Sequence, residues 1–448
     1  MAGKTGSVEA DAAALKRIED ANVKFVSLQF VDIMGVAKAC EVTPARFADA
    51  LENGRWFDGS SIEGYTRIFE SDMLLKPDVG TMKILPGSDT ASVMCDVYLD
   101  ENKPFEGDPR FVLKRAMKKA QEAGFEYKVG PELEFFFFKM QDGTTRPTPD
   151  PHDSGAYFDL SPLDLAAGVR KEAILLMESI GIEIEMGHHE VAPGQHEIDF
   201  KYGSPLVAAD SVLAYKAIVK SVAMKHGLFA SFMPKPISGI NGSGMHVHQS
   251  LWKGSKNAFY DDADTRKLSK TAYSFIAGQL SHARELSGVL APTVNSYKRL
   301  VPGYEAPVYV CWGTTNRSAL IRIPKFIAGR EYARRAELRC PDPSCNPYLA
   351  FAAMLYAGMD GVMKGLTPPA PMEEDVFEFD EHALASKKIG VLPGSLGEAT
   401  KEMSSSALMK EALGEHVHGK LIEAQKAQWN EYLLQVTPWE IEKYLGII

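Results

Sequence analysis

Cysteine is scarce in this chain, and its spacing excludes the usual roles of paired cysteines. Only five occur among 448 residues: Cys40, Cys95, Cys311, Cys340 and Cys345. There is no Cys-x-x-Cys pair, and an odd number spread this widely does not form a disulfide framework. The pattern favours a reducing compartment, so we expect a cytoplasmic protein.

Long apolar runs and an excess of positive charge are missing as well. No segment approaches the roughly 18 uninterrupted apolar residues that indicate a membrane helix, and the first twenty residues lack the apolar core of a secretory signal. The formal net charge is −10, whereas binding to a phosphate backbone depends on clustered lysine and arginine. We therefore expect neither a membrane nor a nucleic acid among the partners.

What is present is the composition of a globular protein, with 45% hydrophobic and 24% charged residues. The length exceeds that of one ordinary domain, and a polar, proline-containing stretch at 100–109 marks a boundary between two. Strands and helices alternate too irregularly for a doubly wound sheet, and no glycine-rich phosphate loop of the common types occurs, so the pattern predicts an α+β fold. We expect helices at 8–22, 109–123, 162–180, 205–226, 267–287 and 408–446, the last broken at 437–438, a hairpin at 23–36, and strands at 92–98 and 126–139.

Two carboxylates stand two residues apart in the very hydrophobic segment 126–139. On a strand, Glu132 and Glu134 point to one face while Leu133 and Phe135 point to the other. Like charges this close are costly in a buried setting, so either their pKa values rise or a cation lies between them. The alternative is an exposed edge strand with solvated glutamates.

A second acidic pair, Glu190 and Glu197, flanks an Ala-Pro-Gly turn. A hairpin there would present both carboxylates side by side. Three histidines share this segment, His188, His189 and His196, but their spacing is not that of a known metal motif, so we interpret them as structural.

The segment 241–250 combines a glycine-rich turn with a strand. The glycines let the backbone approach a ligand closely, and the strand places His246 and His248 on one face. Two histidines with this spacing also occur often by chance.

Arginine is concentrated within forty-one residues of this acidic chain: Arg299, Arg317, Arg322, Arg330, Arg334, Arg335 and Arg339. They alternate with apolar residues, which favours a buried anion site over a solvated basic face. A hard-cation site beside an anion site is typical of phosphoryl transfer.

Five segments resemble the signatures of the glutamine synthetase family: 57–64, 241–248, 295–305, 316–318 and 339–343. The resemblance runs from about residue 16 to the C-terminus and is closest to the prokaryotic type I members. It implies a small β-grasp domain at 16–104 and a large α+β catalytic domain with an antiparallel sheet at 109–448. It also implies a dodecamer of two hexameric rings with active sites between subunits. The apolar C-terminal tail, which a monomer would not cover, would then dock on another subunit.

The resemblance implies a ligand set for Mg²⁺ or Mn²⁺, with two or three ions per active site. Glu134, Glu190 and Glu197 match the ligands of the first ion, and Glu132, His246 and Glu337 match those of the second. Oxygen-dominated sites with one imidazole suit these ions.

The substrates implied are glutamate, ammonia and ATP, joined through γ-glutamyl phosphate. Positions matching glutamate contacts are Asn241, Gly242, Arg299, Glu305 and Arg339. Positions matching nucleotide or phosphate contacts are Glu185, Tyr202, His248, Ser250, Arg317, Arg322 and Arg335. Asp58, Glu305 and Arg317 match catalytic positions, with Asp58 taking a proton from ammonium in a neighbouring subunit's site.

The sequence departs from the family pattern in two places. Phe377 stands where adenylylated members carry a modifiable tyrosine, which favours the subclass without that modification; Arg67 matches a feedback-sensing position of that subclass. Tyr332 stands where lysine or threonine is common, so one nucleotide contact is open. Alternatives are a γ-glutamyl ligase for a polyamine or other amine, a catalytically silent nitrogen-sensing relative, and an unrelated acidic-site nuclease.

Overall fold

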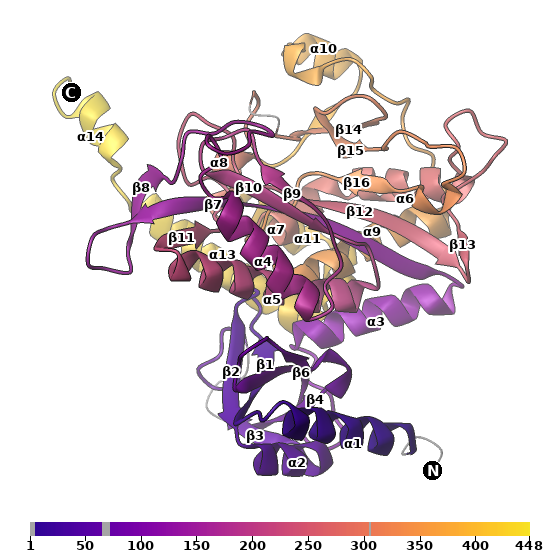
Figure 1. Ribbon diagram of the computed structural model, residues 1–448. Coiled ribbons are helices and arrows are strands. Elements are labelled where there is room, and N and C mark those ends of the chain that lie inside the picture. The colour runs from indigo at the N-terminus through magenta and orange to yellow at the C-terminus, as the bar shows by residue number, and fades with distance from the viewer. Residues whose placement is uncertain (1–4, 65–71, 304–305) are drawn as a thin grey trace.

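The computed structural model describes residues 5–64, 72–303 and 306–448. The N-terminal part forms a small lobe beneath a larger body, and the C-terminal helix projects from the far side (Figure 1). The segment Leu99–Asp108 links the last strand of the lobe to the first helix of the body.

The small domain is built on one sheet with the order β2-β1-β6-β4-β3, and β5 pairs with β6. Strands β1 and β6 are parallel and the other pairs are antiparallel. Helices α1 and α2 complete the domain, and its own core includes Val26, Leu28 and Phe47. The elements are α1 Thr5–Asp20, β1 Phe25–Val31, β2 Ala37–Val42, α2 Pro44–Asn53, β3 Arg55–Asp58, β4 Asp72–Pro77, η1 Val79–Thr81, β5 Lys83–Ile84 and β6 Thr90–Tyr98.

The predicted first strand and the turn near Asp32 to Gly35 are confirmed, but the second strand of the hairpin, β2, lies beyond the predicted range 23–36. The turn is fixed by Asp32, whose Oδ1 accepts the backbone N–H groups of Met34 at 3.0 Å and Val36 at 2.9 Å. Gly35 takes a φ of 81°, a left-handed conformation that glycine adopts without a steric penalty.

The large domain is built on a sheet with the order β17-β14-β15-β16-β12-β7-β10-β9, to which β8, β11 and β13 attach. It is antiparallel except for the parallel pair β14 and β15. The strands are β7 Glu126–Met140, β8 Pro147–Pro151, β9 Ile184–His189, β10 Gln195–Phe200, β11 Leu228–Ser231, β12 Met245–Lys253, β13 Lys256–Asn257, β14 Tyr309–Gly313, β15 Ala319–Arg322, β16 Ala336–Leu338 and β17 Gly390–Val391.

Helices cover one face of this sheet, and α3 and α5 lie between it and the small domain (Figure 1). The helices are α3 Pro109–Glu122, α4 Ala167–Ser179, α5 Pro205–Lys225, α6 Lys270–Ser281, α7 Ala283–Leu290, α8 Ser296–Arg299, α9 Pro347–Lys364, α10 Glu381–Ser386, α11 Leu396–Ser405, α12 Ala407–Leu413, α13 Glu415–Leu433 and α14 Pro438–Tyr444, with 3₁₀ turns η2 Glu331–Ala333 and η3 Val376–Glu378. No helix of the described residues is long and apolar enough to span a bilayer.

The central strand β7 separates the helical core from the functional face. Leu133, Phe135 and Phe137 pack into the main core under the helices, while Phe136 and Phe138 form a small cluster on the opposite face. Glu132 and Glu134 share the parity of Phe136, so they also lie on the face away from the main core. The predicted alternation of the segment 126–139 is therefore confirmed.

Two predicted helices are interrupted. The segment 267–287 forms α6 and α7, separated at His282, whose imidazole lies between Glu285 and Asp360. The segment 408–446 breaks at the predicted Thr437–Pro438, where Thr437 forms a capping box with Glu440. It breaks again at Gly414, whose φ of 82° does not continue a helix.

A buried ionic cluster joins the two domains. The Arg110 guanidinium of α3 binds Asp78 at 2.7 Å and Asp96 at 2.6 Å in the small domain, and Asp210 of α5 at 3.2 Å. Because the Arg110 side chain is only 2% exposed, each of these ion pairs is stronger than a surface pair would be.

Candidate metal and nucleotide site

Three neighbouring strands bring Glu132, His246 and Glu337 together. Glu132 of β7 lies opposite His246 of β12 in the sheet register, and β16 adds Glu337 on the other side of β12. One potential ligand atom from each residue lies within 4.8 Å of the others. His246 Nδ1 is 3.6 Å from both Glu132 Oε2 and Glu337 Oε1. The family resemblance implies that these three residues bind one ion.

The charges in this triad suit a cation. Burial and the charge of Arg339 lower the pKa of His246 to about 4, so its imidazole is neutral and able to ligate at neutral pH. Although burial opposes it, His248 and Arg339 lower the pKa of Glu337. His248 and His246 likewise lower the pKa of Glu132 well below its usual range against the effect of burial. One neutral imidazole and two ionised carboxylates fit a hard divalent ion.

The second acidic group forms around the β9–β10 hairpin, as the turn predicts. Glu197 of β10 lies opposite Glu134 of β7, and the backbone N–H of Glu190 bonds to the carbonyl of Gln195 across the turn at 2.8 Å. His188 joins this group: its Nε2 is 3.4 Å from Glu197 Oε1 and its Nδ1 is 3.8 Å from Glu190 Oε1. Sequence reasoning had treated His188 as structural, whereas the structure places it among potential ligands.

The carboxylates around Glu134 repel one another, and their burial and this repulsion raise their pKa values. Burial, and then the charge of Glu190, raises the pKa of Glu134 to about 8. Burial and the charges of Glu134 and Glu132 raise the pKa of Glu197 well above its usual range. Burial and Glu197 raise that of Asp199 to about 9. A divalent ion would neutralise this repulsion, so the donor set fits one.

A third group, Asp153, His189 and His196, also has potential ligand atoms within 4.8 Å, but its hydrogen bonds disfavour a metal. Arg170 donates to His196 Nδ1 at 2.9 Å, so the proton of the neutral ring lies on Nε2 and that atom has no lone pair to offer. His189 is held between the Asp153 carboxylate at 3.0 Å and the Glu190 carbonyl at 2.7 Å. These hydrogen bonds favour the interpretation of His189 and His196 as structural residues.

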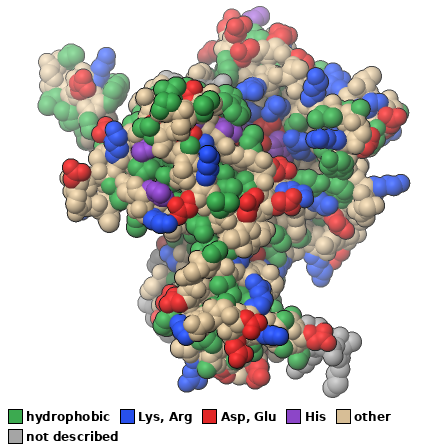
Figure 2. All heavy atoms as spheres, viewed as in Figure 1, with side chains coloured by type: hydrophobic (Ala, Val, Ile, Leu, Met, Phe, Trp, Pro, Cys, Tyr) green, Lys and Arg blue, Asp and Glu red, His purple; other side chains and the backbone are tan. Residues whose placement is uncertain are grey.

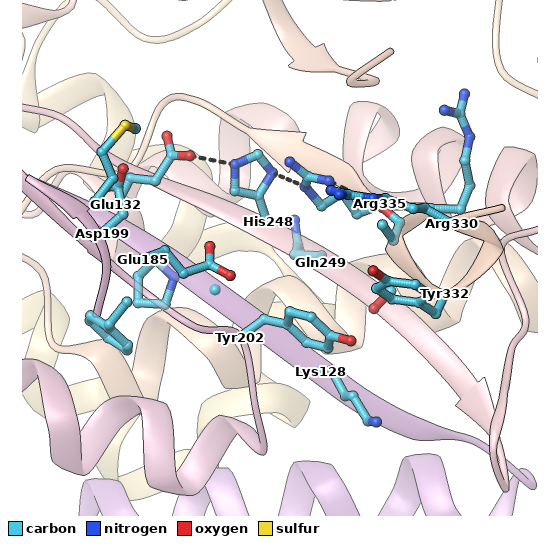
Figure 3. Close-up of a pocket in the computed structure, with 17 residues that line it drawn as sticks. Lys128, Glu132, Glu185, Asp199, Tyr202, His248, Gln249, Arg330, Tyr332 and Arg335 are labelled. Carbon is cyan, nitrogen blue, oxygen red and sulfur yellow. Dashed lines mark hydrogen bonds and ion pairs between the residues drawn. The ribbon is translucent and has the colours of Figure 1, made fainter. Parts of the chain in front are cut away.

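A pocket of about 350 Å³ opens beside the Glu132 triad. Of the residues predicted to contact a nucleotide, it is lined by Glu185, Tyr202, His248, Ser250 and Arg335. Tyr202 and Tyr332 lie at the end of the pocket away from Glu132 (Figure 3). Basic side chains gather on this face of the large domain, with histidines and acidic groups beside them (Figure 2).

A hydrogen-bonded chain connects the pocket to the triad. Arg335 Nε donates to His248 Nδ1 at 3.1 Å, and His248 Nε2 lies 2.6 Å from Glu132 Oε1. Since arginine only donates, His248 carries its proton on Nε2 and donates it to Glu132. Any anion that binds Arg335 is therefore in electrostatic contact with the triad.

Lys128 is a pocket residue that the sequence analysis missed. Its Nζ lies 3.7 Å from the centroid of the Trp252 ring, which stacks on Tyr202. The signal was available, because Lys128 precedes Glu132 by four residues on the same strand and so shares its face.

The arginines divide into two groups. Arg299 and Arg339 are buried; Arg299 donates to the carbonyls of residues 339, 340 and 341, and Arg339 Nη1 binds Glu337 Oε1 at 2.9 Å. Arg322 Nη1 binds the other oxygen of Glu337, also at 2.9 Å. Arg317 is exposed, and neither it nor Arg322 is among the described residues that line the pocket.

The glycine-rich segment 241–244 packs against Arg299. A Cβ on Gly242 would lie 2.2 Å from the Pro234 carbonyl oxygen, and one on Gly244 would lie 2.6 Å from Arg299 Nη2. Gly242 therefore leaves no room for a side chain, whereas a side chain at Gly244 would have to displace the Arg299 guanidinium.

Asp58 ends β3 in the small domain, where its Oδ1 accepts the backbone N–H of Ser60 at 2.8 Å. It is not among the described residues that line the pocket. The predicted residues Arg67 and Glu305 lie outside the described residues.

Comparisons with known proteins agree with this architecture. Residues 22–100 match the family model described as "Glutamine synthetase, beta-Grasp domain", and residues 106–444 match "Glutamine synthetase, catalytic domain". The chain is 50% identical over 436 residues to the glutamine synthetase of Thermotoga maritima, covering 96% of this chain and 98% of that protein. It is 49% identical over 438 residues to that of Methanosarcina mazei, covering 97% of both.

Among solved structures, a chain titled as a GmaS/ADP complex superimposes with a TM-score of 0.87 at 33% identity, covering 97% of this chain and 99% of that one. Both parts of the fold and nearly the whole length are thus shared with one family. The chain belongs to the glutamine synthetase family.

Proposed function

We propose that this protein joins glutamate and ammonia to form glutamine at the expense of ATP, through γ-glutamyl phosphate. The observation that carries the proposal is the pair of carboxylate groups that β7 aims at one face, bordered by the pocket on one side and by buried arginines on the other. Relatives that are about half identical over nearly the whole chain are named glutamine synthetase.

Glu134, Glu190 and Glu197 would hold the first divalent ion, and Glu132, His246 and Glu337 the second. Oxygen-rich donor sets favour Mg²⁺ or Mn²⁺ over softer metals. When bound, the ions would supply positive charge that offsets the carboxylates and the substrate phosphates.

The protein's own residues bind and orient the substrates. Arg299, Arg339 and the backbone at Asn241 and Gly242 would bind glutamate. Glu185, Tyr202, His248 and Ser250 would line the nucleotide site, with Arg317, Arg322 and Arg335 near the phosphates. The glutamate γ-carboxylate attacks the γ-phosphorus and releases ADP; ammonia then attacks the acyl carbon and releases phosphate.

Ammonium must lose a proton before it can attack, because only neutral ammonia has a lone pair. Asp58 of another copy's small domain would accept that proton, and Glu305 would shield the acyl phosphate from water. The position of Asp58 in the small domain supports a site completed between subunits.

The exposed C-terminal tail supports the proposal that subunits assemble into an oligomer. Trp439, Leu445, Ile447 and Ile448 are 61%, 73%, 81% and 94% exposed, on the segment that projects from the body (Figures 1 and 2). Such a patch favours docking on another subunit, in a dodecamer of two hexameric rings. We further propose a β-grasp domain at 16–104 and a catalytic domain at 109–448. We also propose that the protein is cytoplasmic and that Arg67 takes part in feedback sensing.

The test is formation of glutamine from glutamate and ATP with Mg²⁺, comparing ammonium with hydroxylamine and with methylamine and polyamines. Ammonium should give the fastest amide formation. Turnover with a larger amine alone would contradict the choice of ammonia and favour an amine ligase. In an Asp58→Ala variant, ammonium-dependent turnover should fall by at least about a hundredfold while ATP binding persists; parallel loss of both would contradict the role of Asp58.

A further inference from the structure

Gln195, the first residue of β10, is only 1% exposed and uses its whole amide in hydrogen bonds. Its Nε2 donates to Glu134 Oε2 at 2.9 Å and to the Gly242 carbonyl at 3.1 Å. Its Oε1 accepts the backbone N–H of Ala192 at 3.2 Å. Because two partners only accept and one only donates, the orientation of the amide is fixed.

The backbone of Gln195 belongs to the same network. Its carbonyl accepts the N–H of Glu190 at 2.8 Å, and its N–H donates to the Ala192 carbonyl at 3.0 Å. Gln195 therefore contacts Glu134 through its side chain, closes the turn that carries Glu190, and stands two residues before Glu197. Its side chain thus joins the hairpin to the glycine-rich segment at Gly242.

The two donors on Glu134 leave its oxygens unequal. Oε2 accepts the Gln195 amide and also the Gly244 N–H at 2.9 Å, so two donors restrain this carboxylate while no hydrogen bond to Oε1 is recorded among the described residues. Groups that hold a ligating carboxylate in this way typically change metal affinity by roughly tenfold to a hundredfold when they are removed.

We propose that Gln195 is a positioning residue that couples the first metal site to the glutamate site. The proposal rests on the proposed function, because it takes Glu134 as a metal ligand and Gly242 as part of the glutamate site. A single amide links a ligating carboxylate to the carbonyl beside the bound amino acid, so a shift of one displaces the other.

The test compares Gln195→Leu with the wild-type holoenzyme. Removing both donated hydrogen bonds should raise the KM for glutamate and the dissociation constant of Mn²⁺, measured by electron paramagnetic resonance, by about tenfold or more. The KM for ATP should stay within about twofold, because Gln195 is not among the described residues that line the pocket.

Gln425→Leu is the matched control. Gln425 is also 1% exposed; its Nε2 binds the Gly288 carbonyl and its Oε1 accepts from Thr400, but it lies in α13, outside the site. This variant also loses a buried amide. Its KM for glutamate, its KM for ATP and its dissociation constant for Mn²⁺ should all stay within about twofold of the wild type. If Gln195→Leu fails to fold, Gln195→Met keeps a side chain of similar length, removes the donor without adding a charge and should show the same selective change.

The proposal is overturned if the glutamate KM and the Mn²⁺ dissociation constant of the Gln195 variants stay within about twofold of the wild type, or if the ATP KM rises in parallel. Mn²⁺ binding is measured without turnover. A wild-type protein that makes no glutamine would therefore contradict the proposed function and still leave the Gln195 proposal tested by metal affinity.

Discussion

Cation binding should depend steeply on pH because of Glu134. Without a cation, burial and the charge of Glu190 raise the pKa of Glu134 to about 8, and that of Glu197 is also raised. A ligating carboxylate must be ionised, so binding releases a proton below pH 8. For one proton the affinity should fall about tenfold per pH unit well below pH 8, which gives roughly a fifteenfold fall between pH 8 and pH 6.5, and a larger one if Glu197 also releases a proton.

The stability of the folded protein should also depend on pH through protonation of Glu134. Unfolded glutamate titrates near pH 4.3, so the folded, cation-free protein binds the extra proton between that pH and about pH 8. Its stability therefore decreases as pH rises through this window. The cation-bound protein does not require the proton, so the increase in Tm on adding Mn²⁺ should be larger at pH 8 than at pH 6.5.

Isothermal titration calorimetry with Mn²⁺, in two buffers of different ionisation enthalpy, measures both the affinity and the protons released. Glu134→Gln is the matched variant: it keeps the shape, removes the titrating group and should flatten the pH dependence by one proton. An affinity that is constant from about pH 6.5 to pH 8, with no proton release, would refute the reasoning.

Two further predictions concern the domain junction and the nucleotide pocket. Arg110→Leu leaves the buried Asp210 without its guanidinium and should lower the free energy of unfolding by about 3 to 5 kcal/mol. Arg284→Leu, which breaks exposed ion pairs, should cost less than about 1 kcal/mol; urea denaturation compares them, and equal losses would contradict the burial argument. Tyr332→Ala should raise the KM for ATP roughly fivefold or more, through loss of aromatic contact with the base, without changing the KM for glutamate; steady-state kinetics checks this, and an unchanged ATP KM would place the base elsewhere.

Local patterns made part of the site predictable. The two-residue period of a strand was enough to place Glu132 and Glu134 on one face, and the Ala-Pro-Gly turn was enough to place Glu190 beside Glu197. These relations depend on residues close in sequence, and the structure reproduces both.

Contacts between distant segments were not predictable in the same way. Arg322 matches a phosphate position by family resemblance, and the motif did not predict that its guanidinium would also bind Glu337, fifteen residues away. Arg110 gave no local signal, because its partners lie 14 to 100 positions away in sequence and meet only when the domains pack. Burial, which decides how strong such pairs are, is a property of the packed fold and not of the motif.

The order of residues along β7 fits the proposal that one strand contributes to both substrate sites. Lys128 and Gly130 line the pocket at one end of its functional face. Glu132 and Glu134 follow, each in a different carboxylate group, and Phe136 closes the face with a dry cluster. Since successive residues on one face are nearly 7 Å apart, this order would place the proposed nucleotide site, the proposed second and first ions and the apolar cluster in line. Transfer of a phosphoryl group from ATP to glutamate needs that sequence of environments, because charge must be neutralised along the path while water is kept from the acyl phosphate.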